Sequence, residues 1–352
     1  KGVYRSWGGD LMKEAGSTVV KHYKDLAFMG FIEVIKNLPT ILNNLKFCKE
    51  DITAFNPDVL ILIDYPGFNL RIAKWAKEQG FKVIYYISPQ VWAWKENRVK
   101  VIKKVVDKML VILPFEKDFY SGWDYKVEYI GHPLIQVVNE YKSKNNNGNV
   151  DSLLNSNGAK PVIALLPGSR KQEVSIKLPI MLEASKSFPQ YHFVVAKAGS
   201  LEDAFYKDLL SNYPNVSTVK NETYRLLSIA TAALVTSGTA TLETALFEVP
   251  QVVCYKGSAI SYQIAKRLIK IKYISLVNLI MDKPVVKELI QNELTAANII
   301  AELDALLHNN DRKEQLANDY QMLKELLQQG GNASAKGAKI ISDFLHTTSA
   351  KA

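Results

Sequence analysis

Two short segments place small residues, and one arginine, directly after apolar stretches that have the length of strands. Val162–Pro167 runs into Gly168–Arg170, and Ala232–Thr236 runs into Ser237–Ala240. Glycine and serine let backbone N–H groups approach a phosphate, and the helix that follows adds positive partial charge at its N-terminus. Arg170 adds a planar donor fork that suits a diphosphate. Either turn alone could be ordinary Ser or Thr capping, but the two together favour an anion-binding site.

Three further residues have side chains that could take part in chemistry. Asp64 ends the apolar stretch Val59–Asp64, where its carboxylate could accept the proton of an attacking hydroxyl. Fixing the turn before the next helix is an equally good explanation of Asp64. The amide of Asn278 could hydrogen-bond a sugar or a base, although alone it fits a loop residue better. His132, in a Gly-His-Pro sequence, is expected to be structural.

No metal site or cofactor is expected from the sequence. It has no Asp-x-Asp, and its 5 histidines are scattered without ligand spacing. A leaving diphosphate would then be stabilised by Arg170 and the helix N-termini alone. The phosphate-binding loop of nucleoside triphosphatases and the Gly-x-Gly-x-x-Gly turn of nicotinamide enzymes are both missing.

Strands and helices alternate along most of the chain, which is typical of parallel sheets covered by helices. In the first half we expect strands at 59–64, 81–87, 108–114 and 125–131, and in the second half at 162–167, 192–196, 232–236 and 251–255. The polar Asn/Ser/Gly segment 142–158 has the composition of a linker. The predicted fold class is therefore α/β, with two facing Rossmann-like domains, a cleft between them and a helical C-terminal segment.

The domains expected from this pattern divide the chain at the linker. Residues 1–141 form the first domain, 159–325 the second, and 326–352 a C-terminal helix and tail. The opening residues Tyr4–Asp10 have the pattern of a second strand running into a loop. The first domain is thus expected to lack its initial strand, loop and helix.

The charge balance favours anionic partners. The chain of 352 residues has 44 basic and 35 acidic residues, a net charge of +9. Two basic segments, Lys95–Lys108 and Lys266–Lys272, alternate charged and apolar residues at helical spacing. Each is either the solvated face of an amphipathic helix or a surface for phosphates or anionic lipid headgroups. No nucleic-acid-binding motif occurs, and no apolar run is long enough to cross a bilayer.

Leu26–Ile35 is unusually rich in large apolar residues. Such stretches are most often core-facing helices, but this composition would also suit a membrane interface or contact with acyl chains. The candidate acceptor- or membrane-contacting residues are Phe28, Met29, Phe31, Ile32 and Ile35.

Taken together, the sequence resembles the lipid-A-disaccharide synthases over nearly its whole length. The segments that carry the resemblance are GGDLMKEAG (8–16), LAFMGFIEV (26–34), IDYPGFNLRIAK (63–74), YYISPQVWAW (85–94), LPFEKDFY (113–120), IGHP (130–133), LLPGSR (165–170), SGTATLE (237–243), AKRLIK (265–270) and YISLVNL (273–279). The combination of SPQVWAW, LLPGSR and SGTATLE is more specific than a general Rossmann pattern.

This resemblance implies the glycosyltransferase-B fold and an inverting, metal-independent transfer. The implied donor is a UDP-linked diacylglucosamine, and the acceptor is a diacylglucosamine 1-phosphate. Their β-1′,6 linkage would release UDP at the cytoplasmic face of a Gram-negative inner membrane, with the enzyme peripherally bound there. The nucleotide-sugar residues at matching motif positions are Gly168, Ser169, Arg170, Ser237, Gly238, Thr239, Glu243 and Asn278, and Ala240 of the second turn is expected to join them. The catalytic residues expected from the chain's own pattern are Asp64 and Arg170.

One departure from the family pattern leaves the catalytic base open. Many relatives have Pro-Asp-Phe-Asn where this chain has Pro66-Gly67-Phe68-Asn69, and that aspartate is the favoured base. With Gly67 at this position, the base is either Asp64 or a residue elsewhere. Two other functions also stay open: an enzyme like the UDP-GlcNAc 2-epimerases, which needs no lipid, and a silent module that binds UDP or anionic lipid. The acyl-chain preference and the presence of a homo-oligomer also stay open.

Overall fold

The computed structural model describes residues 2–25, 37–145, 160–258, 262–263, 267 and 271–349. Within it the chain divides into two compact units, one of residues 1–85 with 105–107 and the other of residues 86–104 with 108–352. The apolar segment at 26–35 lies outside the described residues, as do residues 266 and 268–270 of the basic segment 266–272. The domain boundaries expected at 141 and 159 stay a prediction.

The first unit contains a small parallel sheet and a pair of packed helices. Strand β1 (Arg5–Gly8) pairs in parallel with β2 (Thr18–His22), and the short helix α1 (Asp10–Glu14) lies between them in the chain. Helix α3 (Leu38–Phe55) packs against α4 (Pro66–Glu78), which follows strand β3 (Leu60–Ile63). Helix α4 buries Phe68, Ile72, Ala73 and Ala76, whose spacing gives the helix one apolar face.

Short elements connect the two halves of the sequence. Strand β4 is Val83–Tyr86, helix η2 is Glu96–Arg98, α5 is Val99–Val105, β5 is Lys108–Val111, α6 is Glu116–Ser121, β6 is Glu128–Tyr129 and α7 is Pro133–Lys144. Strands β5 and β6 are parallel, with Leu110 opposite Glu128. Helix α5 buries Val99 and Ile102 and exposes its lysines, as an amphipathic helix does.

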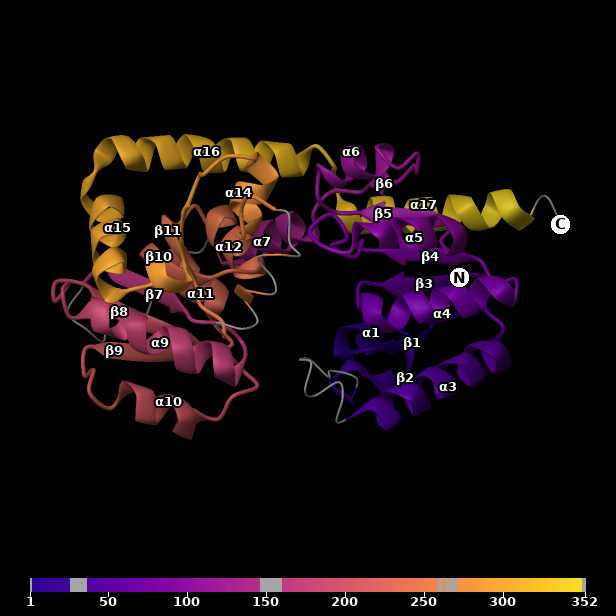
Figure 1. Cartoon of the computed structure of the whole chain (residues 1–352), viewed down its shortest axis with the longest axis horizontal. Helices are drawn as coiled ribbons and strands as arrows, with labels where there is room; N and C mark the ends of the chain where they lie inside the picture. Colours follow the sequence, from indigo (N-terminus) through magenta and orange to yellow (C-terminus); the bar gives the residue numbers. More distant parts are fainter. Residues whose placement is uncertain are drawn as a thin grey trace. The chain divides into compact units, whose positions relative to one another are not determined.

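The second unit is built around a six-stranded parallel sheet (Figure 1) in the order β12-β11-β10-β7-β8-β9. Its strands are β7 (Val162–Leu166), β8 (His192–Lys197), β9 (Val216–Lys220), β10 (Ala230–Thr236), β11 (Gln251–Tyr255) and β12 (Lys287–Ile290). All five residues of β7 are buried, as expected for a central strand of a parallel sheet. Leu166 of β7 pairs with Val235 of β10, and Thr236 pairs with Cys254 of β11. This register brings the carboxyl ends of β7 and β10 together.

Helices connect the strands and complete the C-terminal segment. They are α9 (Lys171–Ser185), α10 (Asp203–Leu210), α11 (Thr223–Ile229), α12 (Thr239–Leu246), α14 (Leu276–Met281), α15 (Ala296–His308), α16 (Asn310–Gln328) and α17 (Ala333–Ser349). Helix α15 packs on α9 and on β10 to β12, whereas α11 packs on β7 to β9. The expected α/β class with parallel sheets and a helical C-terminal segment is confirmed. None of the described helices combines the length and apolar character that a bilayer-spanning segment requires.

Candidate functional site

The two glycine-containing turns predicted from the sequence lie at the same edge of the six-stranded sheet. Because Leu166 pairs with Val235, Gly168–Arg170 and Ser237–Thr239 follow neighbouring strands. Helix α9 begins directly after the first turn, and α12 begins at Thr239 in the second. The first N–H groups of each helix have no intrahelical partner and carry positive partial charge. The structure therefore brings two candidate anion-binding helix ends together.

Gly168 is required in the first turn for two reasons. Its φ is +123°, a conformation that side chains rarely adopt. A Cβ at this position would also lie only 2.5 Å from Oε2 of Glu173. The missing side chain therefore leaves room for the Glu173 carboxylate to lie against the turn. Beside it, the carbonyl of Ser169 accepts a hydrogen bond of 3.4 Å from the Ser200 hydroxyl.

The shape of the second turn is fixed by two hydroxyl groups, those of Ser237 and Thr241. Gly238 precedes α12 with a φ of +146°, and no atom would touch a Cβ there, so conformation alone demands glycine. The Ser237 hydroxyl donates to the carbonyl of Ile274 at 2.8 Å, and the Thr241 hydroxyl to the carbonyl of Gly238 at 2.8 Å. Gly238 and Thr239 are exposed. The turn thus presents backbone to solvent while its hydroxyls fix its shape.

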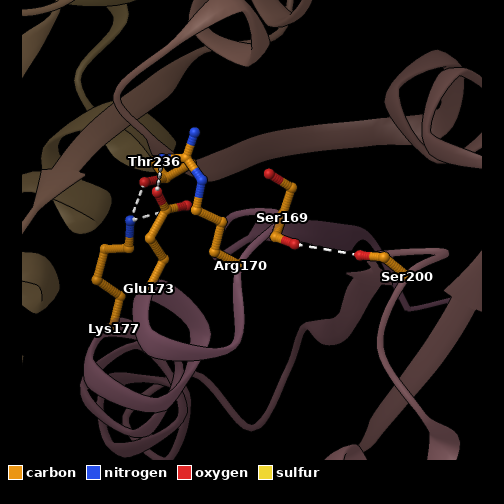
Figure 2. Close-up of polar contacts among 6 residues, drawn as sticks. All are labelled: Ser169, Arg170, Glu173, Lys177, Ser200 and Thr236. Carbon is orange, nitrogen blue, oxygen red and sulfur yellow. Dashed lines mark hydrogen bonds and ion pairs between the residues drawn. The ribbon is translucent and has the colours of Figure 1, made fainter. Parts of the chain in front are cut away.

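A chain of charged side chains links the two turns (Figure 2). Arg170 donates to Oε1 of Glu173 at 3.0 Å, and Nζ of Lys177 lies 4.0 Å from Oε2 of the same carboxylate. Lys177 also donates a hydrogen bond to the hydroxyl of Thr236, the last residue of β10. Burial lowers the pKa of Lys177, while the nearby Glu173 carboxylate acts in the opposite direction. Lys177 therefore connects the helix after the first turn to the strand before the second.

Glu243 and Asn278 lie on helices near the second turn and are both held by neighbours. The Glu243 carboxylate, one turn into α12, accepts a hydrogen bond of 2.8 Å from the Tyr224 hydroxyl. Asn278 is buried, accepts from the Val286 N–H, and donates to the Val286 carbonyl and to Glu288. Its amide therefore ties α14 to the start of β12. Contact of either residue with a nucleotide stays a prediction.

Asp64, in the first unit, has unusual backbone geometry. Asp64 and Tyr65 are consecutive non-glycine residues with φ values of +42° and +45°, and strained backbone of this kind clusters at functional sites. The Asp64 carbonyl accepts from the Asn69 amide at 2.8 Å and from the Tyr85 hydroxyl at 2.5 Å. Desolvation raises the pKa of the Asp64 carboxyl, partly offset by the N–H of Tyr65. The turn is thus anchored through its backbone, in an exposed residue whose carboxyl is partly desolvated.

His132 and Glu116 are buried ionisable groups with structural contacts. His132 caps α7, since its Nδ1 accepts from the N–H of Leu134 at 3.3 Å, and burial lowers its pKa to about 4. Burial raises the pKa of Glu116 to about 7, although the N–H groups of Ile112 and Leu113 bond its carboxylate. The structural role expected for His132 fits this cap.

The predicted membrane-contacting residues and the question of a metal site need separate mention. Phe28, Met29, Phe31, Ile32 and Ile35 lie outside the described residues. Across the described ranges, no group of three or more His, Cys, Asp or Glu side chains has the arrangement of a metal site.

Sequence reasoning missed Lys177, Tyr224 and Glu288, which hold the predicted site residues in place. Lys177 carried a usable signal, because it lies three residues after Val174 and four before Met181 on the apolar face of α9. A lysine on such a face is rarely buried without a partner. Tyr224 and Glu288 carry no such signal, since both depend on contacts distant in sequence.

The comparisons with known proteins point to one family. The family model described as lipid-A-disaccharide synthetase matches residues 6–341. The lipid-A-disaccharide synthase of Syntrophus aciditrophicus (strain SB) is 40% identical over 329 residues, covering 91% of this chain and 84% of that protein. The synthase of Coxiella burnetii (strain CbuG_Q212) is 36% identical over 342 residues, covering 96% of this chain and 89% of that protein.

Solved structures share the fold at low sequence identity. The UDP-GlcNAc 2-epimerase from Neisseria meningitidis, bound to UDP-GlcNAc, has a TM-score of 0.63 at 15% identity, covering 96% of this chain and 88% of that one. The glycotransferase of kitacinnamycin also has a TM-score of 0.63 at 15% identity, covering 95% and 88%. At this identity the likeness shows the glycosyltransferase-B fold alone. The family match and the well-covered relatives decide between these activities, and the chain belongs to the lipid-A-disaccharide synthase family.

Proposed function

We propose that this chain transfers diacylglucosamine from its UDP donor to diacylglucosamine 1-phosphate, forming the β-1′,6-linked disaccharide and releasing UDP. The observation that carries the proposal is the pairing of the two turns at one sheet edge, within a chain of the lipid-A-disaccharide synthase family. Residues 159–325 would bind the nucleotide-sugar, and residues 1–141 would bind the acceptor.

The diphosphate of the donor would lie against Gly168–Arg170 and Gly238–Ala240. The helix ends of α9 and α12 would donate N–H groups, and Arg170 would supply the charged fork. When the bond between the anomeric carbon and the diphosphate breaks, negative charge grows on the leaving UDP. Fixed donors aimed at that charge stabilise the transition state without a metal ion.

The acceptor hydroxyl would attack the anomeric carbon from the opposite face, which inverts the configuration. Its proton would pass to Asp64, whose raised pKa suits a general base better than an ordinary carboxylate does. The hydrogen bonds from Asn69 and Tyr85 to its carbonyl would hold the backbone of Asp64 in place. Glu243 and Asn278 would complete the nucleotide-sugar site.

The enzyme would work while bound peripherally to the cytoplasmic face of the inner membrane, where both lipid substrates reside. Among the described residues, Trp94 is 41% exposed, with Nζ of Lys95 4.4 Å and Cζ of Arg98 5.5 Å from its ring centroid. The exposed lysines of α5 follow directly. A tryptophan flanked by basic side chains suits the headgroup region of an anionic bilayer.

The test is to incubate the protein with both substrates and EDTA and to seek the tetraacyl disaccharide phosphate by mass spectrometry. We expect the product in the presence of EDTA. For Arg170→Ala we expect slower formation of the product, with ~100-fold lower kcat/KM, because one transition-state donor is removed. A matched control is Arg225→Ala, which removes an arginine that pairs with Glu222 elsewhere in the same unit. Inactivation by EDTA would contradict the metal-free mechanism, and epimerisation of UDP-GlcNAc without disaccharide would contradict the proposed reaction.

A further inference from the structure

The Arg170–Glu173–Lys177 chain contains one carboxylate between two cations. Glu173 Oε1 accepts from Arg170 at 3.0 Å, and Glu173 Oε2 lies 4.0 Å from the ammonium of Lys177. Figure 2 shows the carboxylate between the two basic side chains, above the first turn of α9. In this structure the carboxylate therefore pairs with the cation that the proposed reaction needs for the diphosphate.

The exposure of the three side chains says which of them can move. The side chain of Arg170 is 59% exposed, that of Glu173 is 30% exposed and that of Lys177 is 3% exposed. Lys177 is also fixed by its hydrogen bond to Thr236. A ligand at the turn can thus draw Arg170 away from Glu173, whereas Lys177 stays where it is.

Moving Arg170 to a ligand changes the surroundings of Glu173. A partly buried carboxylate that loses a cationic partner is destabilised unless another cation replaces it. Lys177 is already within ion-pair distance and has no such freedom to leave. Its charge is therefore placed to stabilise Glu173 when Arg170 turns to a diphosphate.

We propose that Lys177 is a positioning residue that compensates Glu173 and thereby releases Arg170 to bind the diphosphate of the donor. This inference rests on the proposed function, because it assumes that the ligand at the turn is a nucleoside diphosphate. Lys177 acts through Glu173 and Arg170 and makes no contact with substrate.

The experiment is a double-mutant cycle read by calorimetric titration with UDP. Lys177→Met keeps most of the side-chain volume and removes the charge, so we expect about tenfold weaker UDP binding, the range of coupling between charges in one network. Glu173→Gln should bind UDP at least as tightly as the wild type, because the diphosphate no longer competes with the Glu173 carboxylate for Arg170. The double variant should return to within about twofold of Glu173→Gln, since the lysine has nothing left to compensate.

A matched control separates this mechanism from a general effect of charge. Glu183→Gln removes the same charge from the same helix, but Glu183 pairs with Lys186 and Tyr213. It should leave UDP affinity unchanged. If Glu183→Gln tightens binding as much as Glu173→Gln does, the effect is not specific and the inference is overturned.

The remaining outcomes separate the inference from the proposed function. A double variant as weak as Lys177→Met would show that the lysine acts through the fold, not through Glu173, and would overturn the inference. If Lys177→Met does not fold, as judged by its thermal melt, the UDP affinity of Glu173→Gln alone tests the inference. Weaker UDP binding by Glu173→Gln than by the wild type overturns it. Absence of UDP binding by the wild type would overturn both proposals. If the wild type binds UDP but the effects of Lys177→Met and Glu173→Gln on UDP affinity simply add in the double variant, only this inference is overturned.

Discussion

Asp64 combines a strained backbone with a carboxyl whose pKa is raised by desolvation, and the strain guides the choice of variant. Asparagine tolerates a left-handed φ better than most residues, so Asp64→Asn preserves the turn while removing the base. We expect kcat to fall at least ~100-fold, the usual contribution of a general base. UDP affinity should stay within twofold of the wild type, because the proposed nucleotide site lies in the other half of the sequence. Steady-state kinetics and titration with UDP check this, and an unchanged kcat would remove Asp64 from the mechanism.

Gly67 offers a second test of which carboxylate serves as the general base, because many relatives have aspartate at this position. It is exposed in the first turn of α4, and no atom lies within 4 Å of a Cβ built there. An aspartate would replace a glycine inside a helix and interact favourably with the helix dipole, for a gain of about 0.5–1 kcal/mol in unfolding free energy. We expect Gly67→Asp to melt at or above the wild-type temperature and to keep its turnover. In the Asp64→Asn background, recovery of turnover would show that a carboxylate at position 67 can replace Asp64.

His132 gives a prediction about stability and pH. Its pKa is lowered from 6.5 to about 4 because the ring is buried. The unfolded chain therefore takes up a proton below pH 6.5 while the folded chain does not, so stability present above pH 6.5 is lost as the pH falls towards 4. Linkage puts the loss between pH 7 and pH 5 at about 2 kcal/mol.

The variant His132→Asn keeps a side chain that caps helices well and removes the titration. We expect the drop in unfolding free energy between pH 7 and pH 5, measured by urea denaturation, to be about 2 kcal/mol smaller than in the wild type. Glu116 changes stability in the opposite direction, since its raised pKa favours the folded state at low pH, but it is common to both proteins. An identical drop in the two proteins would contradict the buried, neutral histidine.

Among the elements, one close backbone contact lies where the C-terminal segment passes the end of β6. A Cβ on Gly131 would lie 2.9 Å from the carbonyl oxygen of Gly331, and a Cβ on Gly330 would overlap the backbone of Gly131. We expect Gly330→Ala to lower the unfolding free energy by about 1–3 kcal/mol, the usual cost of overpacking. Gly337→Ala is the matched control, since its Cβ would meet only side-chain atoms at 3.6 Å or more. Equal melting temperatures for the two variants would contradict this crossing.

The strands that sequence reasoning found and missed differ in their place in the sheet. The four strands expected in the second half are β7, β8, β10 and β11, all with neighbours on both sides. The two strands of this sheet that were missed, β9 and β12, are its edges, and most of their residues are only partly buried. An edge strand needs no continuous apolar run, so Val-Ser-Thr-Val-Lys and Lys-Glu-Leu-Ile give a weak signal. Their pairing depends on the finished sheet.

In the candidate site, too, local signals could be predicted from the sequence and long-range contacts could not. The turns at Gly168–Arg170 and Ser237–Ala240 could be predicted because glycine after an apolar strand is a local signal. The support given by Tyr224 to Glu243 and by Glu288 to Asn278 spans 19 and 10 residues. Such pairs are set by the packing of whole helices and strands. Local sequence therefore identified the groups proposed to touch substrate, and packing determined the groups that hold them.

For the whole molecule, the net charge of +9 has a local counterpart in α5. Its apolar residues Val99 and Ile102 are buried, and its lysines remain exposed beside Trp94. From the sequence, this segment was either the solvated face of an amphipathic helix or a lipid-binding surface. In α5 both can hold, because the apolar face packs inside the protein while the exposed lysines can contact lipid headgroups. If this surface meets the bilayer, each basic residue near the anionic surface contributes about 1 kcal/mol to binding.

Co-sedimentation with vesicles tests this surface. The double variant Lys100→Glu/Lys104→Glu reverses two exposed charges, and we expect its partition onto vesicles of phosphatidylglycerol and phosphatidylethanolamine to fall about tenfold or more. Lys313→Glu/Lys336→Glu, which makes the same change of charge far along the sequence, should bind nearly as well as the wild type. High salt should weaken wild-type binding, because exposed charges are screened. Equal binding by the two double variants would mean that overall charge, and not the surface at Trp94 and α5, brings the protein to the membrane.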